Sequence, residues 1–140
     1  MRQHGNRPEI MVVDDDPDTL VVLVRHIKRE GYAVREACSG AECLRLAKIQ
    51  PPDVILMDLM MPEMDGFAVV AALQKEAGWR DIPVIVITSL DLDAKDRERL
   101  NAGVQFVLVK ERFRPADLVE RIRRLVHRKP VLISGMEAAS

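Results

Sequence analysis

Hydrophobic positions along the chain follow two alternating patterns. Short runs of apolar, often β-branched residues predict buried strands, and longer segments with apolar residues three or four apart predict amphipathic helices. The predicted strands are Glu9–Val13, Tyr32–Ala37, Pro51–Asp58, Ile82–Ser89 and Gln105–Lys110. A helical pattern follows each of them, so the sequence predicts five β-α units in succession.

The predicted helices carry start and stop signals. Asp16 is the expected cap of the first helix, Pro17 its first residue and Gly31 its end. Ser39 with Glu42 predicts a capping box for the second helix. The other helices are expected over about 66–76, over 92–102 with Gly103 as the stop, and from Pro115 onward. The apolar positions expected to face the sheet are Leu20, Leu23, Val24 and Ile27, then Leu44, Leu46 and Ala47, then Phe67, Val70 and Leu73, and finally Leu118, Ile122, Leu125 and Val126.

This order of elements predicts a parallel sheet. Parallel neighbours need crossover connections, which are right-handed, and a helix after every strand supplies them. The Ile82–Ser89 strand is apolar nearly throughout, as expected for a strand covered by helices on both faces. The expected fold class is α/β, a doubly wound five-stranded parallel sheet, and 140 residues fit one domain.

Polar side chains follow four of the predicted strands at the same end. In an open α/β sheet, ligands bind outside the carboxyl ends of the strands. These residues are Asp14 and Asp15 after the first strand, Asp58 at the end of the third, Thr88 and Ser89 at the end of the fourth, and Lys110 at the end of the fifth.

These residue types suit a metal-assisted phosphoryl site. Clustered carboxylates repel one another unless a cation intervenes, and Mg²⁺ is typically held by one or two carboxylates plus a phosphate. Asp15 and Asp58 are the expected ligands, with Asp14 binding directly or through water. Lys110 supplies a positive charge and the Thr88 hydroxyl a hydrogen bond to an anionic oxygen. Asp58 is the candidate nucleophile that would form an acyl phosphate, and the small Ser89 leaves the site accessible.

Each signal also has a simpler interpretation. The acidic run before the first helix would serve as a helix cap, and MPEMDG would be a turn with Gly66 at a special backbone dihedral. The shared location of all the polar residues favours the functional interpretation.

Composition narrows the remaining choices. The net charge is −1, and no apolar run reaches the length that a bilayer crossing needs. The first residues, MRQHGNRP, lack the apolar centre of a signal peptide, so we expect a cytoplasmic protein. Cys38 and Cys43 match neither a redox pair nor a zinc site, and we interpret them as structural thiols. His4, His26 and His127 show no ligand or triad spacing.

Four motifs together resemble one known family. They are VVDDD (12–16), VILMDLMMPEMDG (54–66), VIVITS (84–89) and FVLVK (106–110). The chain resembles the receiver domains of two-component response regulators, the chemotaxis single-domain receivers among them, over about residues 8–129. The resemblance implies a flavodoxin-like (βα)5 fold with strand order 2-1-3-4-5. Residues 1–7 would then be an N-terminal extension and residues 130–140 a tail or linker.

The resemblance also implies roles for the site residues. A phosphoryl group would pass from a phosphohistidine, on a sensor kinase or a phosphotransfer protein, to Asp58. Mg²⁺ would be held by Asp14, Asp15, Asp58 and the backbone carbonyl of Met60. Thr88 and Lys110 would sense the phosphoryl group and alter the face made by the fourth helix, fifth strand and fifth helix. The chain would thus be a signalling phosphoacceptor that catalyses its own phosphorylation and dephosphorylation, rather than an enzyme with an external substrate.

Two positions depart from the family. Glu111 follows Lys110, where the family usually has a proline joined by a cis bond. Because a cis bond without proline costs ~3–4 kcal/mol, we expect a trans bond and a rearranged loop. Val107 stands where the family often has a switch aromatic, and Phe106 beside it should face the other side of the sheet.

The partner predictions rest on the last helix and the tail. Arg121, Arg123, Arg124, Arg128 and Lys129 either complement the helix dipole or form a docking face for an acidic partner. The sequence contains no helix-turn-helix or RNA-binding motif, so we expect no nucleic acid partner for this chain, and no membrane. For the apolar residues 131–133, docking on the domain, homodimer formation and the start of a linker all stay open.

Two rival functions also stay open. The first is a receiver-like module that binds partners without being phosphorylated, although Asp58, Thr88 and Lys110 argue against it. The second is a phosphotransferase or phosphatase of the haloacid dehalogenase type. That class needs an Asp-x-Asp pair, whereas Leu59 and Met60 follow Asp58.

Overall fold

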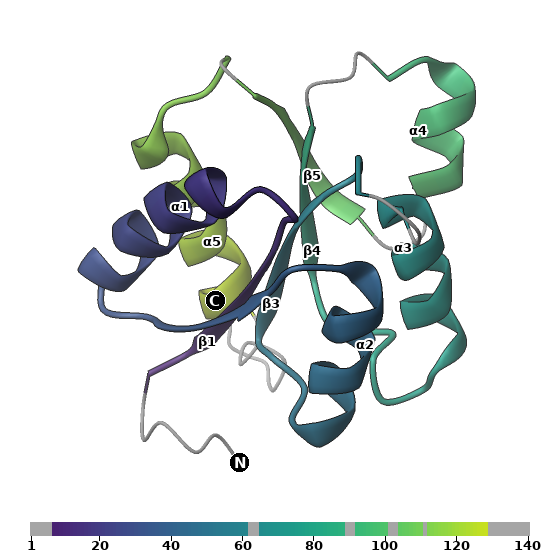
Figure 1. Ribbon diagram of the computed structural model, residues 1–140, viewed down its shortest axis with the longest axis horizontal. Helices are drawn as coiled ribbons and strands as arrows, with labels where there is room; N and C mark the ends of the chain where they lie inside the picture. Colours follow the sequence, from purple (N-terminus) through teal and green to yellow (C-terminus); the bar gives the residue numbers. More distant parts are fainter. Residues whose placement is uncertain (1–6, 62–64, 89–91, 101–103, 111, 129–140) are drawn as a thin grey trace.

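The chain folds into a parallel sheet with helices on both faces (Figure 1). The structure, a computed structural model, describes residues 7–61, 65–88, 92–100, 104–110 and 112–128. In these ranges the strands are β1 (Glu9–Val13), β2 (Ala33–Ala37), β3 (Val54–Asp58), β4 (Val84–Thr88) and β5 (Val104–Val109). The helices are α1 (Pro17–Arg29), α2 (Gly40–Ile49), α3 (Gly66–Lys75), α4 (Ala94–Leu100) and α5 (Pro115–Arg128). The sheet order β2-β1-β3-β4-β5 confirms the predicted fold class.

The helices divide between the two faces of the sheet. Figure 1 shows α1 and α5 on one face and α2, α3 and α4 on the other. Alternate residues of each central strand point to opposite faces of the sheet. On β1, Ile10 and Val12 pack with α1 and α5, whereas Met11 and Val13 pack with α2 and α3. The central strands β1, β3 and β4 are buried along their whole length, as the apolar runs predicted.

The predicted helix signals work with small differences. The Asp16 carboxylate accepts the backbone N–H of Asp18, and α1 ends before Gly31, whose φ of 96° favours glycine. The Ser39 hydroxyl caps α2 by accepting the N–H of Glu42 at 3.1 Å. In a full capping box the Glu42 carboxylate would accept the N–H of Ser39, but here it accepts the N–H of Cys38 at 2.7 Å.

Two strands begin two or three residues later than the hydrophobic pattern predicts. We predicted the third strand from Pro51 and the fourth from Ile82, but β3 begins at Val54 and β4 at Val84. Prolines at 51, 52 and 83 explain the shorter strands because proline has no N–H to donate to a neighbouring strand. The predicted Gly103 helix stop lies outside the described residues.

A buried ion pair fixes the end of the sheet opposite the acidic residues. The Glu9 carboxylate is buried, and its Oε2 lies 2.8 Å from Nε of Arg35 on β2. The Arg35 guanidinium also donates to the carbonyls of Leu46 and Gln50 at the end of α2. Arg35 therefore joins β1, β2 and α2.

Among the described helices, none combines the length and the apolar character needed to cross a membrane.

Candidate functional site

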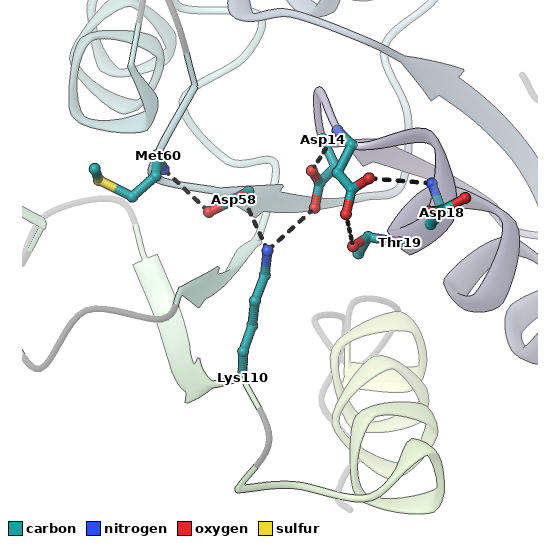
Figure 2. Close-up of polar contacts among 7 residues, drawn as sticks. Asp14, Asp18, Thr19, Asp58, Met60 and Lys110 are labelled. Carbon is teal, nitrogen blue, oxygen red and sulfur yellow. Dashed lines mark hydrogen bonds and ion pairs between the residues drawn. The ribbon is translucent and has the colours of Figure 1, made fainter.

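Three carboxylates meet at the carboxyl ends of two adjacent central strands (Figure 2). Asp14 and Asp15 follow β1, and Asp58 is the last residue of β3, its neighbour in the sheet. One oxygen from each carboxylate lies within 4.8 Å of the others. Asp14 is 2% exposed and Asp58 is 6% exposed, whereas Asp15 is exposed. The strand register therefore brings together residues 44 positions apart in the chain, counted from Asp14 to Asp58.

Lys110 extends from the end of β5 into the same group of acids. Its Nζ donates to Oδ2 of Asp58 at 3.1 Å and lies 3.7 Å from Oδ2 of Asp14. Figure 2 shows the Lys110 side chain pointing toward both carboxylates. The Lys110 backbone N–H donates to the carbonyl of Thr88 at 2.9 Å, which continues the β4–β5 pairing to this position. The ladder thus holds the base of the lysine while its ammonium reaches the acids.

The two buried carboxylates are oriented in the same way. Oδ1 of Asp14 accepts the backbone N–H of Asp16 at 2.9 Å, and Oδ1 of Asp58 accepts the backbone N–H of Met60 at 3.0 Å. Each aspartate therefore bonds the N–H two residues later, a common local interaction for this side chain. In both residues, Oδ2 is the oxygen that faces Lys110.

The electrostatics of the site reflect crowded acids around one cation. Burial raises the pKa of Asp14, the hydrogen bond from Asp16 opposes this rise, and the negative charge of Asp58 adds to it. Burial alone would lower the pKa of Lys110, but its hydrogen bond to Asp58 and the charge of Asp14 outweigh burial and raise that pKa. The cluster thus favours added positive charge.

Gly66 is needed for close approach and not for an unusual dihedral. A Cβ at Gly66 would lie 2.7 Å from the Leu59 Cα and 3.0 Å from the Asp58 carbonyl oxygen. The Gly66 N–H also donates to the Leu59 carbonyl at 3.0 Å. The alternative in which Gly66 sits at a special dihedral is wrong: Gly66 begins α3, which Asp65 caps by accepting the Ala68 N–H. The absent side chain lets α3 start directly against the end of β3.

The donor set of the site fits a magnesium ion. Hard oxygen ligands from one or two carboxylates are what Mg²⁺ prefers in proteins, and three carboxylate oxygens lie within 4.8 Å of one another. Met60, two residues after Asp58, is 53% exposed. In Figure 2 its side chain points away from the acids.

Other predicted site residues are placed less completely. Thr88 ends β4, is fully buried and lies one position after Ile87, which pairs with Asp58. Ser89 lies outside the described residues. The trans bond and loop rearrangement predicted at Glu111 also fall outside them and stay a prediction.

The two residues at the expected switch position face opposite sides, as predicted. Phe106 packs against the cluster made by α1 and α5, and Val107 packs against the cluster made by α2, α3 and α4. The Arg121 guanidinium lies 4.7 Å from the centre of the Phe106 ring. A cavity of about 170 Å³ adjoins Val107, with Arg97, Leu100 and Val104 as its other lining residues. The small side chain thus leaves space between α4 and β5.

Several basic residues of α5 have local partners. Arg123 pairs with Glu120 at 2.8 Å and with Glu30, the C-cap of α1, at 3.6 Å, and Arg124 pairs with Glu120 at 3.3 Å. These ion pairs indicate that Arg123 and Arg124 interact with neighbouring acidic side chains of the same domain. Lys129 lies outside the described residues.

A pocket that the sequence did not predict lies next to Lys110. It is lined by Asp18, Thr19, Val22 and Leu23 of α1, by Ile87 of β4 and by Phe113, in addition to Lys110 itself. The sequence feature that could have indicated this pocket is the pair of adjacent apolar residues Val21 and Val22, which lie outside the predicted inward positions of α1. Both are exposed, by 56% and 51%.

A parallel (βα)5 fold with clustered acids and a lysine at its carboxyl edge defines a class of α/β signalling domain. The model of the response regulator receiver domain family matches residues 10–123. The chain belongs to this family, and its acidic pocket of Asp14, Asp15 and Asp58 fits a phosphoacceptor and Mg²⁺ site.

Similar curated proteins are regulators of about twice this length. The chain is 40% identical over 122 residues to the transcriptional regulatory protein PrrA of Mycobacterium tuberculosis, covering 87% of the chain and 51% of that protein. It is 32% identical over 121 residues to the DNA-binding dual master transcriptional regulator RpaA of Synechocystis, covering 86% and 50%. The chain thus spans about half the length of these relatives.

Solved structures agree with the family and the fold. The receiver domain of a signal transduction histidine kinase from Syntrophus aciditrophicus superimposes with a TM-score of 0.79 at 30% identity, covering 95% of this chain and 97% of that one. The receiver domain of sensor histidine kinase PA1611 from Pseudomonas aeruginosa gives 0.77 at 31% identity, covering 86% and 98%. That structure has a magnesium ion coordinated in its active site cleft.

Proposed function

We propose that Asp58 is the phosphoacceptor of this receiver domain. The observation that carries the proposal is the pairing of its buried carboxylate with Lys110 at 3.1 Å, beside two further acids. Asp58 is the last residue of β3, the middle strand of the sheet, and Lys110 lies closer to it than to Asp14. Asp14 follows the other central strand β1 and is held by the Asp16 N–H.

Transfer from a phosphohistidine requires one bond to form and one to break. An Asp58 carboxylate oxygen attacks phosphorus, the phosphorus–nitrogen bond breaks, and its electron pair returns to the imidazole of the donor. Lys110, which pairs with the Asp58 carboxylate in this structure, then pairs with the phosphoryl oxygens. The Thr88 hydroxyl donates a hydrogen bond to the same group. A protein of this kind catalyses its own phosphorylation and dephosphorylation.

Asp14, Asp15, Asp58 and the backbone carbonyl of Met60 are the proposed ligands of Mg²⁺. A bound Mg²⁺ supplies positive charge that neutralises the acids and the transferred phosphoryl oxygens. The chain's own contribution is to hold Asp14 and Asp58 in fixed orientations through the N–H groups two residues later.

The proposed donor is a sensor histidine kinase or a phosphotransfer protein, and the proposed output is a protein bound at the face of α4, β5 and α5. Phosphorylation would shift the balance between two arrangements of that face. Residues 8–129 form the proposed receiver unit, between an extension over 1–7 and a tail or linker over 130–140. Because the relatives are about twice as long, a further output segment in the whole protein belongs to this proposal. Transfer from an ATP-dependent kinase suits a cytoplasmic location.

Acetyl phosphate with Mg²⁺, followed by intact mass measurement, tests the acceptor. The wild-type protein should gain one phosphoryl mass, and Asp58→Asn should gain none. Asp16→Asn is the matched control, because it changes a neighbouring acid outside the three-carboxylate cluster to another good helix cap. A wild-type protein that stays unlabelled beside a labelled receiver in the same tube would favour the unphosphorylated binding module. Labelling of Asp58→Asn would overturn the assignment of Asp58.

A further inference from the structure

Lys110 belongs to both the acidic site and the neighbouring pocket. Its ammonium contacts Asp58 and Asp14, and its side chain also lines a pocket of about 410 Å³ between α1 and the segment that follows β5. Figure 2 shows Asp18 and Thr19 at the start of α1, on the far side of Asp14 from Met60. The pocket therefore begins where a phosphoryl group on Asp58 would be bound.

The pocket is apolar away from its rim. Ile87 of β4 is 3% exposed and belongs to the core, and Leu23 and Phe113 pack against that core. Val22 is exposed and lines the same space. Carbon surfaces held by a packed core make a wall that is already formed before a ligand arrives, as in most small-molecule sites.

Any phosphoryl donor brings a leaving group as well as a phosphoryl group. We propose that this pocket receives the leaving group of low-molecular-mass acyl phosphates and prefers donors with an apolar acyl chain. This inference rests on the proposed phosphorylation of Asp58. It adds a preference among acyl phosphates for an apolar acyl chain, which the acidic cluster does not specify.

The reaction balances without another reactant. An Asp58 oxygen forms a bond to phosphorus, and the bond from phosphorus to the acyl oxygen breaks. The electron pair leaves with the carboxylate of the released acid, so no proton, oxidant or reductant is needed. Lys110 stands between the two ends of the donor, where its positive charge is complementary to the phosphoryl oxygens and to the departing carboxylate.

The lining predicts which acyl chains bind. An acetyl group offers one methyl to this apolar surface, and a butyryl group offers two more methylenes. Each methylene removed from water contributes a factor of about four to binding when fully buried, and less in an open pocket. The exposed Asp18 carboxylate at the rim disfavours a chain that ends in a second negative charge.

Acetyl and butyryl phosphate make a matched pair of donors because their leaving groups have nearly the same basicity. The test measures the rate of phosphoryl gain on the full chain at low donor concentration with Mg²⁺. For the wild-type protein we expect butyryl phosphate to react at least about fivefold faster than acetyl phosphate. Val22→Asn should lower the butyryl phosphate rate and bring this ratio close to one.

Val21→Asn is the control because the two valines are adjacent, similarly exposed and on the same helix, but Val21 does not line the pocket. This variant should keep the wild-type ratio. A direct binding measurement uses Asp58→Asn, which keeps Lys110 and the pocket but cannot be phosphorylated at that position. Titration with butyryl phosphate should shift the methyl signals of Val22 and Leu23 in NMR spectra, and those of Val21 much less.

The outcomes separate this inference from the function on which it rests. Equal wild-type rates with the two donors, or an unchanged ratio in Val22→Asn, would overturn the leaving-group pocket and leave Asp58 as the acceptor. A loss of the ratio in Val21→Asn as large as in Val22→Asn would also overturn it. Failure of both donors to label the wild-type protein would overturn the proposed phosphorylation itself.

Discussion

The ammonium of Lys110 lies 3.1 Å from Oδ2 of Asp58 and holds that carboxylate against the end of β3. The same ammonium is 3.7 Å from Oδ2 of Asp14. One cation at the end of the edge strand β5 thus offsets part of the charge of two buried acids at the ends of the central strands β1 and β3. A bound metal ion and Lys110 would therefore both offset the negative charge of Asp14 and Asp58. Removing Lys110 should change how strongly a metal ion stabilises the protein.

Lys110→Met should make the metal-free protein less stable and more responsive to Mg²⁺. Loss of the ammonium leaves two buried carboxylates without their cation, at a cost of about 1–3 kcal/mol because Lys110 is itself partly exposed. Thermal unfolding with and without Mg²⁺ should show a lower melting temperature without the ion and a larger rise with it. Lys48→Met, at an exposed position on α2, should show neither change. A Mg²⁺ response equal to that of the wild type would contradict the shared role of ion and lysine.

Asp14→Asn should stabilise the metal-free protein at neutral pH by about 1 kcal/mol. Burial raises the pKa of Asp14, so the folded state disfavours its charged form. The asparagine Oδ1 can still accept the Asp16 N–H, so the local turn is kept.

The pH dependence of this gain follows from the sign of the shift. A raised folded-state pKa gives Asp14 a stabilising contribution below the ordinary value of 3.8, and this contribution is lost as pH rises through the folded pKa. The advantage of Asp14→Asn should therefore vanish below about that pH and grow above it. Denaturant unfolding at a series of pH values measures the difference. A variant less stable than the wild type at neutral pH would show that burial does not disfavour the charged form of Asp14.

Gly66→Ala should destabilise the protein by about 2–3 kcal/mol and slow labelling of Asp58. The new Cβ would meet the Leu59 Cα at 2.7 Å, and backbone at this point cannot move without shifting the end of β3. Gly78→Ala is the matched control, since its Cβ would meet nothing within 4 Å. Its stability should change by less than about 0.5 kcal/mol. Equal unfolding free energies for the two variants would rule out the close approach.

The two cysteines should differ in reactivity. Both are free thiols, but Cys38 is exposed and Cys43 is buried in the cluster beneath α2, where burial raises the pKa of Cys43 to about 12. Because the thiolate is the reactive form, Cys43 should not react at neutral pH until the protein unfolds. A thiol reagent should therefore modify one group per native molecule and two per unfolded molecule, and Cys38→Ser should remove the native reaction. Modification of Cys43 in the folded protein would contradict this placement.

Local patterns predicted the elements because they depend on neighbouring residues. Glu9–Val13 was predicted with its observed bounds, and Asp16 and Pro17 were predicted in their observed positions at the start of α1. The predicted strand starts at Pro51 and Ile82 were wrong, because the hydrophobic pattern does not show that a proline has no N–H to donate to a neighbouring strand. The opposite directions of Phe106 and Val107 followed from strand alternation, which is also local.

The sequence by itself determined the succession of strands and helices and the acids and lysine that end the strands, because period, cap and turn signals act over a few residues. Only the tertiary structure decided that Lys110 reaches Asp14 and Asp58 together, that Gly66 lies against Leu59, and that Val22 and Phe113 share a pocket beside the acids. The contacts of Lys110 and the pocket shared by Val22 and Phe113 join residues far apart in the chain, and their distances depend on strand order and register. Gly66 and Leu59 are close in the chain, but their contact depends on how α3 packs against the end of β3. No short stretch of sequence contains that information.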